Sequence, residues 1–440
     1  MSLARRLASQ SSVIFAARIF GAGFIFATQA LIARLWGAQL LGEFLLTVAS
    51  VNLVAVVMPL GFHTVGTYFA AEYRARGSRQ QLLAFLARAY GHVLLTFVGL
   101  IIAGPMLLDL IGQGQGTLAL HFVPFALLTL GTAIVYVNSA MLVGLKRPFA
   151  GFFADALLRP MIVLASFLFA LGVGLPEAGF TQMLWCFGLA YIVVSLVQFG
   201  LVIKSLPQVP LSADPAPVDS KRWWRFALPW VIISLATDFF FDIDLLLLSH
   251  LLSKEELAIF GVCTRIFSLV SFGVAAVYAV TMPDMFESEA KADRSEFNRK
   301  VGEANAVASG VALLLFGGAV VGAPFALMLF GPDFAAGAAP LAILCLSLVV
   351  RSVLGPASIV LSIHDRPWAS LPAIALGIVS LFVSNLVLVP AMGLVGASLA
   401  AILSITIWSM ALWMTALHTA RVDVSILQWF RSRRVVVAAE

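Results

Sequence analysis

Charged side chains are scarce in this chain. They make up 11% of its 440 residues, whereas hydrophobic residues make up 61%. Soluble globular proteins carry about 25% charged residues. The apolar runs fill the whole length, which excludes a soluble domain held by one anchor. The sequence is that of an integral membrane protein. Its net charge of +5 does not indicate nucleic-acid binding, because the basic residues lie in loops that alternate along the chain.

Cysteine is also rare, and the common signatures of catalysis are missing from the sequence. Cys186, Cys263 and Cys345 all lie inside apolar runs without metal or redox spacing, so we interpret them as packing residues. No P-loop, H-E-x-x-H or G-x-S-x-G pattern occurs. The loops expected outside the membrane are too short to fold a catalytic domain. We therefore expect no enzyme activity, no cofactor, no bound metal and no direct use of ATP.

The apolar runs predict the fold class. A helix needs about 20 apolar residues to cross a bilayer. Twelve runs of sufficient length lie near residues 12–35, 40–63, 86–110, 117–144, 151–172, 179–203, 225–250, 256–282, 304–330, 335–362, 369–390 and 394–418. We predict an all-α polytopic membrane protein with about twelve transmembrane helices.

The basic residues predict the orientation of these helices. Most of the 27 lysines and arginines fall in one set of alternating loops, with clusters at residues 74–88, 221–225, 291–300 and 421–434. Arg34 and Lys254 fall in the opposite set. Cytoplasmic loops of membrane proteins are enriched in Lys and Arg. Both termini are therefore predicted to be cytoplasmic.

A proline-rich linker and a weak internal repeat divide the chain into two halves. The linker carries Pro207, Pro210, Pro215 and Pro217. Residues 33–44 resemble residues 249–260, and residues 146–149 resemble residues 365–368. Both halves would start in the cytoplasm, as in parallel transporter repeats. We predict two six-helix lobes with a central cavity: residues 1–206 form the first lobe, 207–222 a cytoplasmic linker, 223–420 the second lobe and 421–440 a basic cytoplasmic tail.

Four arginines lie deep in the apolar runs: Arg18, Arg159, Arg265 and Arg351. An arginine at the centre of a membrane helix costs roughly 2.5–3.5 kcal/mol on insertion scales, so these side chains are expected to face a hydrated interior. A guanidinium grips phosphate bidentately and keeps its charge. We therefore predict that the four arginines bind an anionic substrate. For Arg159 an ion pair with Asp155, one helical turn away, is an equal alternative.

The seventh apolar run is acidic, with Asp238, Asp242 and Asp244 in the sequence TDFFFDIDLLLL. Asp238 and Asp242 are one helical turn apart and share a face. Carboxylates inside a membrane often mark proton or cation pathways. Asp238, Asp242 and Asp155 are therefore candidates for ion coupling. A salt bridge from this run to a buried arginine is the alternative.

Several segments resemble a known family. They are Arg18-Ile-Phe-Gly21, residues 30–37 (ALIARLWG), residues 41–44 (LGEF), residues 242–247 (DIDLLL), Ile259-Phe-Gly261 with Arg265, and residues 393–400 (GLVGASLA). Together they resemble the bacterial polysaccharide and oligosaccharide flippases, which include lipopolysaccharide biosynthesis proteins. These belong to the multidrug/oligosaccharidyl-lipid/polysaccharide exporter superfamily, whose MATE-like fold has two six-helix lobes around a V-shaped cavity.

The resemblance implies a function. Such flippases move undecaprenyl-diphosphate-linked oligosaccharides from the cytoplasmic to the periplasmic leaflet of the inner membrane by alternating access, for surface polysaccharide or O-antigen synthesis. Membrane lipids and polysaccharide polymerase or assembly proteins would be their partners. Related peptidoglycan-precursor flippases have an arginine where Arg18 stands, but they follow it with an Arg-Asp pair where this chain has Phe24-Ile25. They also have two extra spans, so the cell-wall precursor is not the expected substrate.

A second function stays open within the same superfamily. A cation-coupled antiporter of small molecules would explain the acidic seventh run, but it would not explain the arginines inside the membrane. Such an antiporter predicts drug sensitivity on deletion and normal surface polysaccharide.

Overall fold

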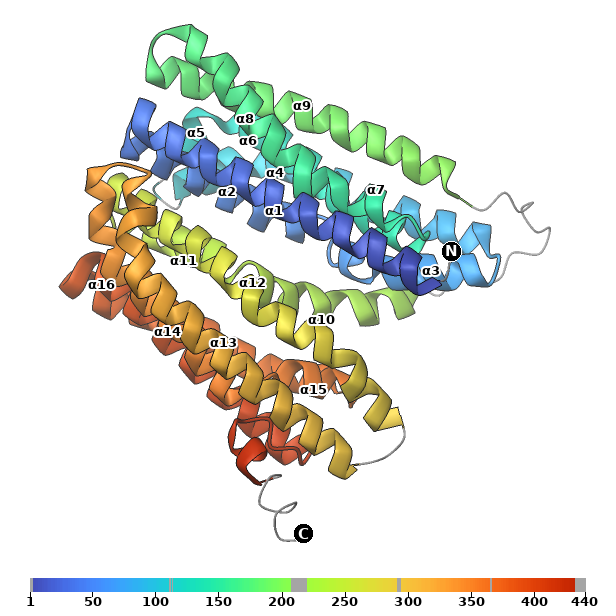
Figure 1. Cartoon of the computed structure of the whole chain (residues 1–440). Coiled ribbons are helices and arrows are strands. Elements are labelled where there is room, and N and C mark those ends of the chain that lie inside the picture. Colours follow the sequence, from blue (N-terminus) through green and yellow to red (C-terminus); the bar gives the residue numbers. More distant parts are fainter. Residues whose placement is uncertain are drawn as a thin grey trace. The chain divides into compact units, whose positions relative to one another are not determined.

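The computed structural model describes residues 3–110, 112, 114–206, 220–290, 294–364 and 366–431. Helices dominate these residues, and no strand occurs among them (Figure 1). The chain divides into two compact units, Met1–Ile243 and Asp244–Glu440. Because a bilayer offers no hydrogen-bond partners for exposed peptide groups, long helices are the expected solution for such an apolar sequence.

The first unit is built around α6 (Phe122–Gly144), which packs against α2, α3, α4 and α9. Helix α1 packs on α2 and on the segment formed by α7, η1 and α8. The bounds of the other elements are α1 Leu3–Trp36, α2 Ala38–Val57, α3 Phe62–Ala75, α4 Arg79–Leu110, α5 Thr117–Leu120, α7 Pro148–Phe153, η1 Ala154–Leu158, α8 Arg159–Ala170, η2 Leu171–Val173, α9 Pro176–Lys204 and α10 Ser220–Asp238.

Helix α11 (Phe240–Leu248) contains the boundary between the units. In the second unit, α14 (Ala338–Leu354) packs against α12, α13 and α16. The remaining elements are α12 Lys254–Ala290, α13 Arg294–Met328, η3 Pro332–Gly337, α15 Ala357–Ile363, η4 Pro367–Ser370 and α16 Leu371–Thr419. A reciprocal cap starts α12: the Glu256 amide donates to Ser253 Oγ (3.2 Å), and the Ser253 amide donates to Glu256 Oε2 (3.0 Å).

Ten helices among the described residues are long and apolar enough to cross a membrane. The last candidate, Trp368–Thr419, has 52 residues. A helix of that length would extend about 78 Å, more than twice the hydrocarbon core. It is broken at Gly393, where φ is 56° and ψ is −131°, and so contains the predicted eleventh and twelfth spans. The predicted all-α polytopic membrane protein is confirmed.

The predicted seventh span is interrupted. Residues 225–250 were expected to form one helix, but α10 ends at Asp238 and α11 begins at Phe240. Neither part is among the ten candidates: α11 has only nine residues, and α10, with 19, carries too many charged residues. Three aspartates within seven positions make this segment a poor continuous membrane helix, and the backbone bends between the first two of them.

Helix α3 was not predicted, and it anchors the start of α10. Arg222 donates to both oxygens of Glu72, with Nη1–Oε1 at 2.9 Å and Nη2–Oε2 at 3.0 Å. Trp223 is buried and donates from Nε1 to the Tyr73 hydroxyl at 2.7 Å. These contacts place α10 in the first unit. The predicted linker, residues 207–222, lies outside the described residues except for 220–222, which are the first residues of α10.

The described part of the predicted basic tail, residues 421–431, is docked on the second unit. Val424 is fully buried, and the amide of Ile426 donates to Val353 O at 2.9 Å. Asp423 accepts hydrogen bonds from Trp413 Nε1 (2.9 Å), Ser425 Oγ (2.7 Å) and the Ser425 amide (3.0 Å), and it pairs with Arg431 at 2.7 Å. One buried carboxylate therefore organises the chain after α16.

The pKa of Asp423 gives this segment a pH dependence. Burial raises the pKa of Asp423. The hydrogen bonds from Trp413 and Ser425 and the charge of Arg431 together lower it by more, so that the net pKa lies below the usual value for aspartate. Asp423 therefore stabilises the fold above the pKa of an unfolded aspartate, about 3.9. That contribution is lost as the pH falls through the lower pKa of the folded state.

Replacing Asp423 by asparagine should lower the free energy of unfolding at neutral pH by about 1.5–3 kcal/mol, the range for hydrogen bonds to charged groups. The variant should also lose part of the acid-dependent change in stability. Thermal unfolding of the purified protein across the acidic range measures both effects. Glu303→Gln, which removes an exposed ion pair with Arg299, is the control and should change little. Identical curves for Asp423→Asn and the parent would refute this role.

Candidate functional site

Arg159 lies at the centre of a buried polar network in the first unit. Its side chain is 12% exposed and pairs with Asp155 through Nη1–Oδ1 at 3.2 Å. Its second nitrogen, Nη2, donates to Asn52 Oδ1 at 2.8 Å. The guanidinium also lies over the Tyr191 ring, 5.7 Å from the centroid. The predicted Asp155–Arg159 pair is confirmed, so the charge of this arginine is already matched.

The local backbone explains how Arg159 and Asp155 meet. Residues Ala154–Leu158 form a π-helical turn, in which the amide of Arg159 bonds to Ala154 O, five residues back. Pro160 has no amide hydrogen to donate to Ala156 O. Gly21 of α1 packs on that oxygen so closely that a Cβ at position 21 would lie 1.8 Å from it. Such π turns are frequent at functional sites, and here the turn seats α1 directly on the segment that carries the ion pair.

The network extends across three further elements. Asn52 of α2 donates from Nδ2 to Asp242 Oδ2 of α11 at 3.1 Å, and Asp242 is only 7% exposed. The Tyr191 hydroxyl of α9 donates to Asp155 Oδ1 at 3.3 Å. The structure thus brings together three of the predicted site residues, Asp155, Arg159 and Asp242. Asn52 joins them, and a neutral amide gives no signal for this role in the sequence.

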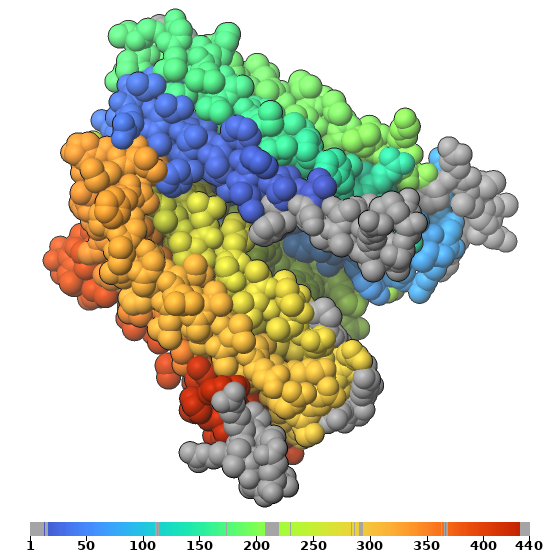
Figure 2. All heavy atoms as spheres, in the orientation of Figure 1, coloured from blue at the N-terminus to red at the C-terminus, as the bar shows by residue number. Residues whose placement is uncertain are grey.

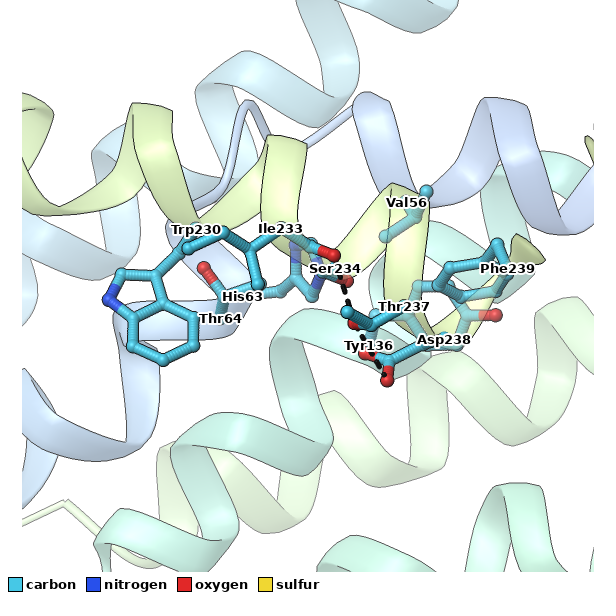
Figure 3. A pocket seen from close by; sticks show the side chains of 10 residues that line it. All are labelled: Val56, His63, Thr64, Tyr136, Trp230, Ile233, Ser234, Thr237, Asp238 and Phe239. Carbon is cyan, nitrogen blue, oxygen red and sulfur yellow. Dashed lines mark hydrogen bonds between the residues drawn. The ribbon is translucent and has the colours of Figure 1, made fainter. Parts of the chain in front are cut away.

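A cavity of about 470 Å³ lies next to this network (Figure 3). Trp230, Ser234, Thr237 and Asp238 of α10 contribute to its lining, together with His63 of α3. The lining residues are Val56, His63, Thr64, Tyr136, Trp230, Ile233, Ser234, Thr237, Asp238 and Phe239. Asp238 is the one carboxylate in this mostly apolar lining.

Tyr136 connects the cavity to the network. It lines the cavity and interacts electrostatically with Arg159, Asp155 and Asp242. His63 stacks on Tyr136 with ring centroids 5.9 Å apart, and its Nδ1 is buried with no hydrogen-bond partner among the described residues. Asp238 accepts from Thr237 Oγ1 at 3.3 Å. A ligand in this cavity would therefore meet one carboxylate, one imidazole and several aromatic faces.

Arg18 lies on α1 beside the same segment. Its guanidinium is 5.3 Å from the centroid of the Phe152 ring, at the end of α7. No carboxylate of the described residues lies within ion-pairing distance of it. Arg18 is exposed, so its charge is accessible, whereas that of Arg159 is enclosed by partners.

The other two predicted arginines belong to the second unit. Arg265 is half-buried in the first third of α12, which packs against α14. Arg351 lies over the Trp408 ring of α16, 5.8 Å from its centroid, with no ion-pairing carboxylate among the described residues. The predicted span of residues 335–362 is not one continuous helix. Gly355, at φ 87°, and Pro356 end α14, so Arg351 occupies its last turn rather than mid-helix.

A second buried carboxylate, Asp244, stands out in the second unit. Asp244 is 0% exposed, and Asn385 of α16 donates to its Oδ1 at 2.7 Å. Asp244 Oδ2 and Asn385 Oδ1 have no hydrogen-bond partner among the described residues. Two unsatisfied oxygens in a buried site favour a proton or a small cation. The described residues contain no cluster of three or more His, Cys, Asp or Glu suited to a metal ion.

No family model and no curated protein matches this sequence. Solved structures do match its fold. An inward-facing multidrug resistance MATE family transporter of the MOP superfamily aligns with a TM-score of 0.71 and 14% identity, over 95% of each chain. Lipid II flippase MurJ, in an inward closed conformation, aligns with a TM-score of 0.71 and 12% identity, over 97% of this chain and 92% of its own.

A third match has a different kind of binding pocket. It is a MOP superfamily transporter from Pyrococcus furiosus, with a TM-score of 0.63 and 16% identity over 97% of this chain and 94% of its own, and it is described as having reversed polarity in the binding pocket. At these identities the likeness establishes the fold, which is that of MOP superfamily transporters. The fold occurs in both drug transporters and a lipid flippase, so it does not identify the substrate.

Proposed function

We propose that this protein is a flippase that moves an undecaprenyl-diphosphate-linked oligosaccharide from the cytoplasmic to the periplasmic leaflet of a bacterial inner membrane by alternating access. Its cargo would supply surface polysaccharide or O-antigen synthesis, where polymerase or assembly proteins are the expected partners. The observation that carries the proposal is the state of Arg18 and Arg351. Each lies in an apolar helix against an aromatic ring, without a carboxylate partner among the described residues.

The electrostatic argument favours an anionic cargo. An arginine keeps its charge inside a membrane protein, and holding it there without an anion costs free energy. A diphosphate would supply that anion and could accept paired hydrogen bonds from each planar guanidinium. Arg18, Arg265 and Arg351 are the proposed substrate-binding residues. Arg159 is reassigned to positioning, because its charge is already paired with Asp155 and its Nη2 donates to Asn52.

Coupling to an ion gradient would use carboxylates that have an oxygen without a hydrogen-bond partner among the described residues. Asp155 and Asp242 are both engaged in the Arg159 network. Asp238 faces the cavity, and Asp244 has an unsatisfied Oδ2 beside the unsatisfied Asn385 Oδ1. We therefore place ion coupling at Asp244 and Asn385, with Asp238 as the second candidate.

Replacing Asp244 by asparagine should abolish the dependence of transport on an ion gradient while preserving the fold. The amide has the same shape but neither binds a proton nor carries a charge. Transport by purified protein in proteoliposomes should become equal with and without an imposed proton or sodium gradient. Asp333→Asn, at an exposed position in η3, is the matched control and should retain the gradient effect. Normal gradient dependence in Asp244→Asn would move the coupling site to Asp238.

A deletion strain tests the proposed function itself. Loss of the surface polymer, with lipid-linked repeat units accumulating in the inner leaflet, is the expected result, and the accumulated lipid identifies the cargo. Re-expression of the intact chain should restore the polymer. A normal polysaccharide profile would contradict the proposal.

The cavity of Figure 3 favours one alternative, a cation-coupled small-molecule antiporter. Its volume of about 470 Å³ is typical of a drug-sized site, and its aromatic lining with one carboxylate, Asp238, suits a cationic ligand. In that case the deletion strain should become sensitive to cationic drugs while its polysaccharide stays normal.

A further inference from the structure

A cavity of about 540 Å³ lies in the second unit, where α13 begins and α16 ends. Its lining consists almost entirely of polar and basic residues: Arg294, His364, Arg366, His418, Thr419, Ala420 and Arg421. The positive-inside pattern assigns the three contributing loops to the cytoplasmic side. The cavity shares no residue with the Arg159 network or with the Asp244 site, although Asn385 of that site lies on α16.

Three arginines converge on this cavity. In the part of the chain that the structure describes, the Glu289 carboxylate contacts this lining, 3.6 Å from His364 Nε2. Arg294 Nη2 donates to Arg421 O at 2.8 Å, and Arg366 Nη1 donates to Thr419 O at 3.2 Å. A guanidinium has five N–H donors. Among the described residues, Arg294 and Arg366 each use one donor for a backbone carbonyl. The remaining donors and the positive charge of the guanidinium groups suit a phosphate group.

The backbone at Arg421 departs from the usual end of a helix. Arg421 follows the cap residue Ala420 of α16 and has φ 55°. Glycine is strongly preferred at this position, because a side chain is strained in the left-handed region. The sequence keeps an arginine there instead. Strained backbone conformations cluster at ligand sites, where a side chain is kept for binding although its backbone conformation is unfavourable.

Exposed apolar side chains flank the cavity. Trp368 is two residues after Arg366 and is 53% exposed. Leu427 and Phe430, in the short helical turn after Arg421, are also about half exposed. Figure 2 shows this dark red C-terminal segment packed against the gold-orange atoms of the start of α13. Aromatic residues of this kind mark the headgroup level of a membrane, so a phosphate at this depth is naturally a lipid phosphate.

We propose that the cavity lined by Arg294, Arg366 and Arg421 binds the phosphate of an anionic phospholipid headgroup at the cytoplasmic surface. A free phosphate ion would offer the same chemistry, so the test separates the two sources. The site is independent of the transported cargo, and its failure would leave the proposed flippase activity untouched.

The test uses full-length protein in phosphatidylcholine nanodiscs with and without phosphatidylglycerol. Lipid retained after detergent extraction is counted by native mass spectrometry, and inorganic phosphate is the soluble competitor. The parent should retain phosphatidylglycerol over phosphatidylcholine. Arg366→Ala and Arg421→Gly should each retain it about fivefold less well, the effect of one basic residue near a lipid surface. Arg299→Ala, an exposed arginine of α13 paired with Glu303, is the control and should match the parent.

Arg421→Gly separates binding from folding. Glycine adopts φ 55° without strain, so this variant should melt at the same temperature as the parent or higher while binding less phosphatidylglycerol. Competition by inorganic phosphate would support the cavity but assign it to a soluble phosphate. Equal retention of phosphatidylglycerol by the parent, Arg366→Ala and Arg421→Gly would overturn the proposal.

Discussion

Replacing Arg159 by alanine should lower the free energy of unfolding by about 3 kcal/mol. Breaking a buried ion pair by removing one partner typically costs about 3–5 kcal/mol, because the other charge is left uncompensated. The lower end applies here, since 48% of the Asp155 side chain is exposed and water can screen it. Asn52 Oδ1 would also lose the hydrogen bond that it accepts from Arg159 Nη2. Chemical or thermal unfolding of the purified protein measures the loss.

Two further variants separate the positioning role of Arg159 from a substrate-binding role. Arg159→Lys keeps the charge but cannot bridge Asp155 and Asn52 with a planar fork, so its stability should be intermediate. The double variant Arg159→Met with Asp155→Leu removes both charges and should recover much of the stability. If that variant is stable but cannot transport, Arg159 contacts the cargo after all. Unchanged stability in Arg159→Ala would show that the network does not hold these helices.

The triple variant with Arg18, Arg265 and Arg351 changed to alanine should flip a lipid-linked oligosaccharide at least ~100-fold more slowly than the parent. Each hydrogen bond between a guanidinium and a charged oxygen is worth about 1.5–3 kcal/mol, and one such loss is already about ten- to hundredfold. Flipping by purified protein in proteoliposomes, with an undecaprenyl-diphosphate-linked glycan, is the measurement.

The controls for the triple variant test charge and geometry separately. Arg34→Ala removes an arginine from the same helix as Arg18, at its predicted outer end, and should transport normally. Lysine at the three positions keeps the charge but loses bidentate contact, so partial activity is expected. Undiminished flipping by a well-folded triple alanine variant would eliminate the arginines as the diphosphate site and remove the main support for an anionic cargo.

The helices that the sequence predicts well are those that consist of uninterrupted apolar residues, as a bilayer requires. Uninterrupted apolar runs such as α6 have one stable solution in lipid, so their positions follow from hydropathy. Helix α3 was missed because it mixes aromatic and charged residues, and its stability comes from packing with Trp223, far along the chain. The bend between Asp238 and Phe240 was also missed, because hydropathy averages over the aspartates that cause it.

The candidate site was predictable only where its partners are close in sequence. The spacing of Asp155 and Arg159 indicated a pair, which the structure confirms. Asn52 and Asp242 are 190 positions apart, and Asn385 and Asp244 are 141 apart. No local pattern marks such amides as partners of a carboxylate. The roles of the four arginines in substrate binding and of the aspartates in ion coupling stay predictions.

The π-helical turn Ala154–Leu158 also sets a constraint on how this chain can change through evolution. A π turn holds one residue more than the α-helical turn that would replace it. Deleting a single residue there would restore a regular helix and rotate everything before it by about 100° relative to α8. Phe152, with the Arg18 guanidinium over its ring, would swing away, and α1 would lose the carbonyl on which Gly21 rests. Insertions and deletions should therefore be tolerated in the loops between spans but not in this five-residue segment.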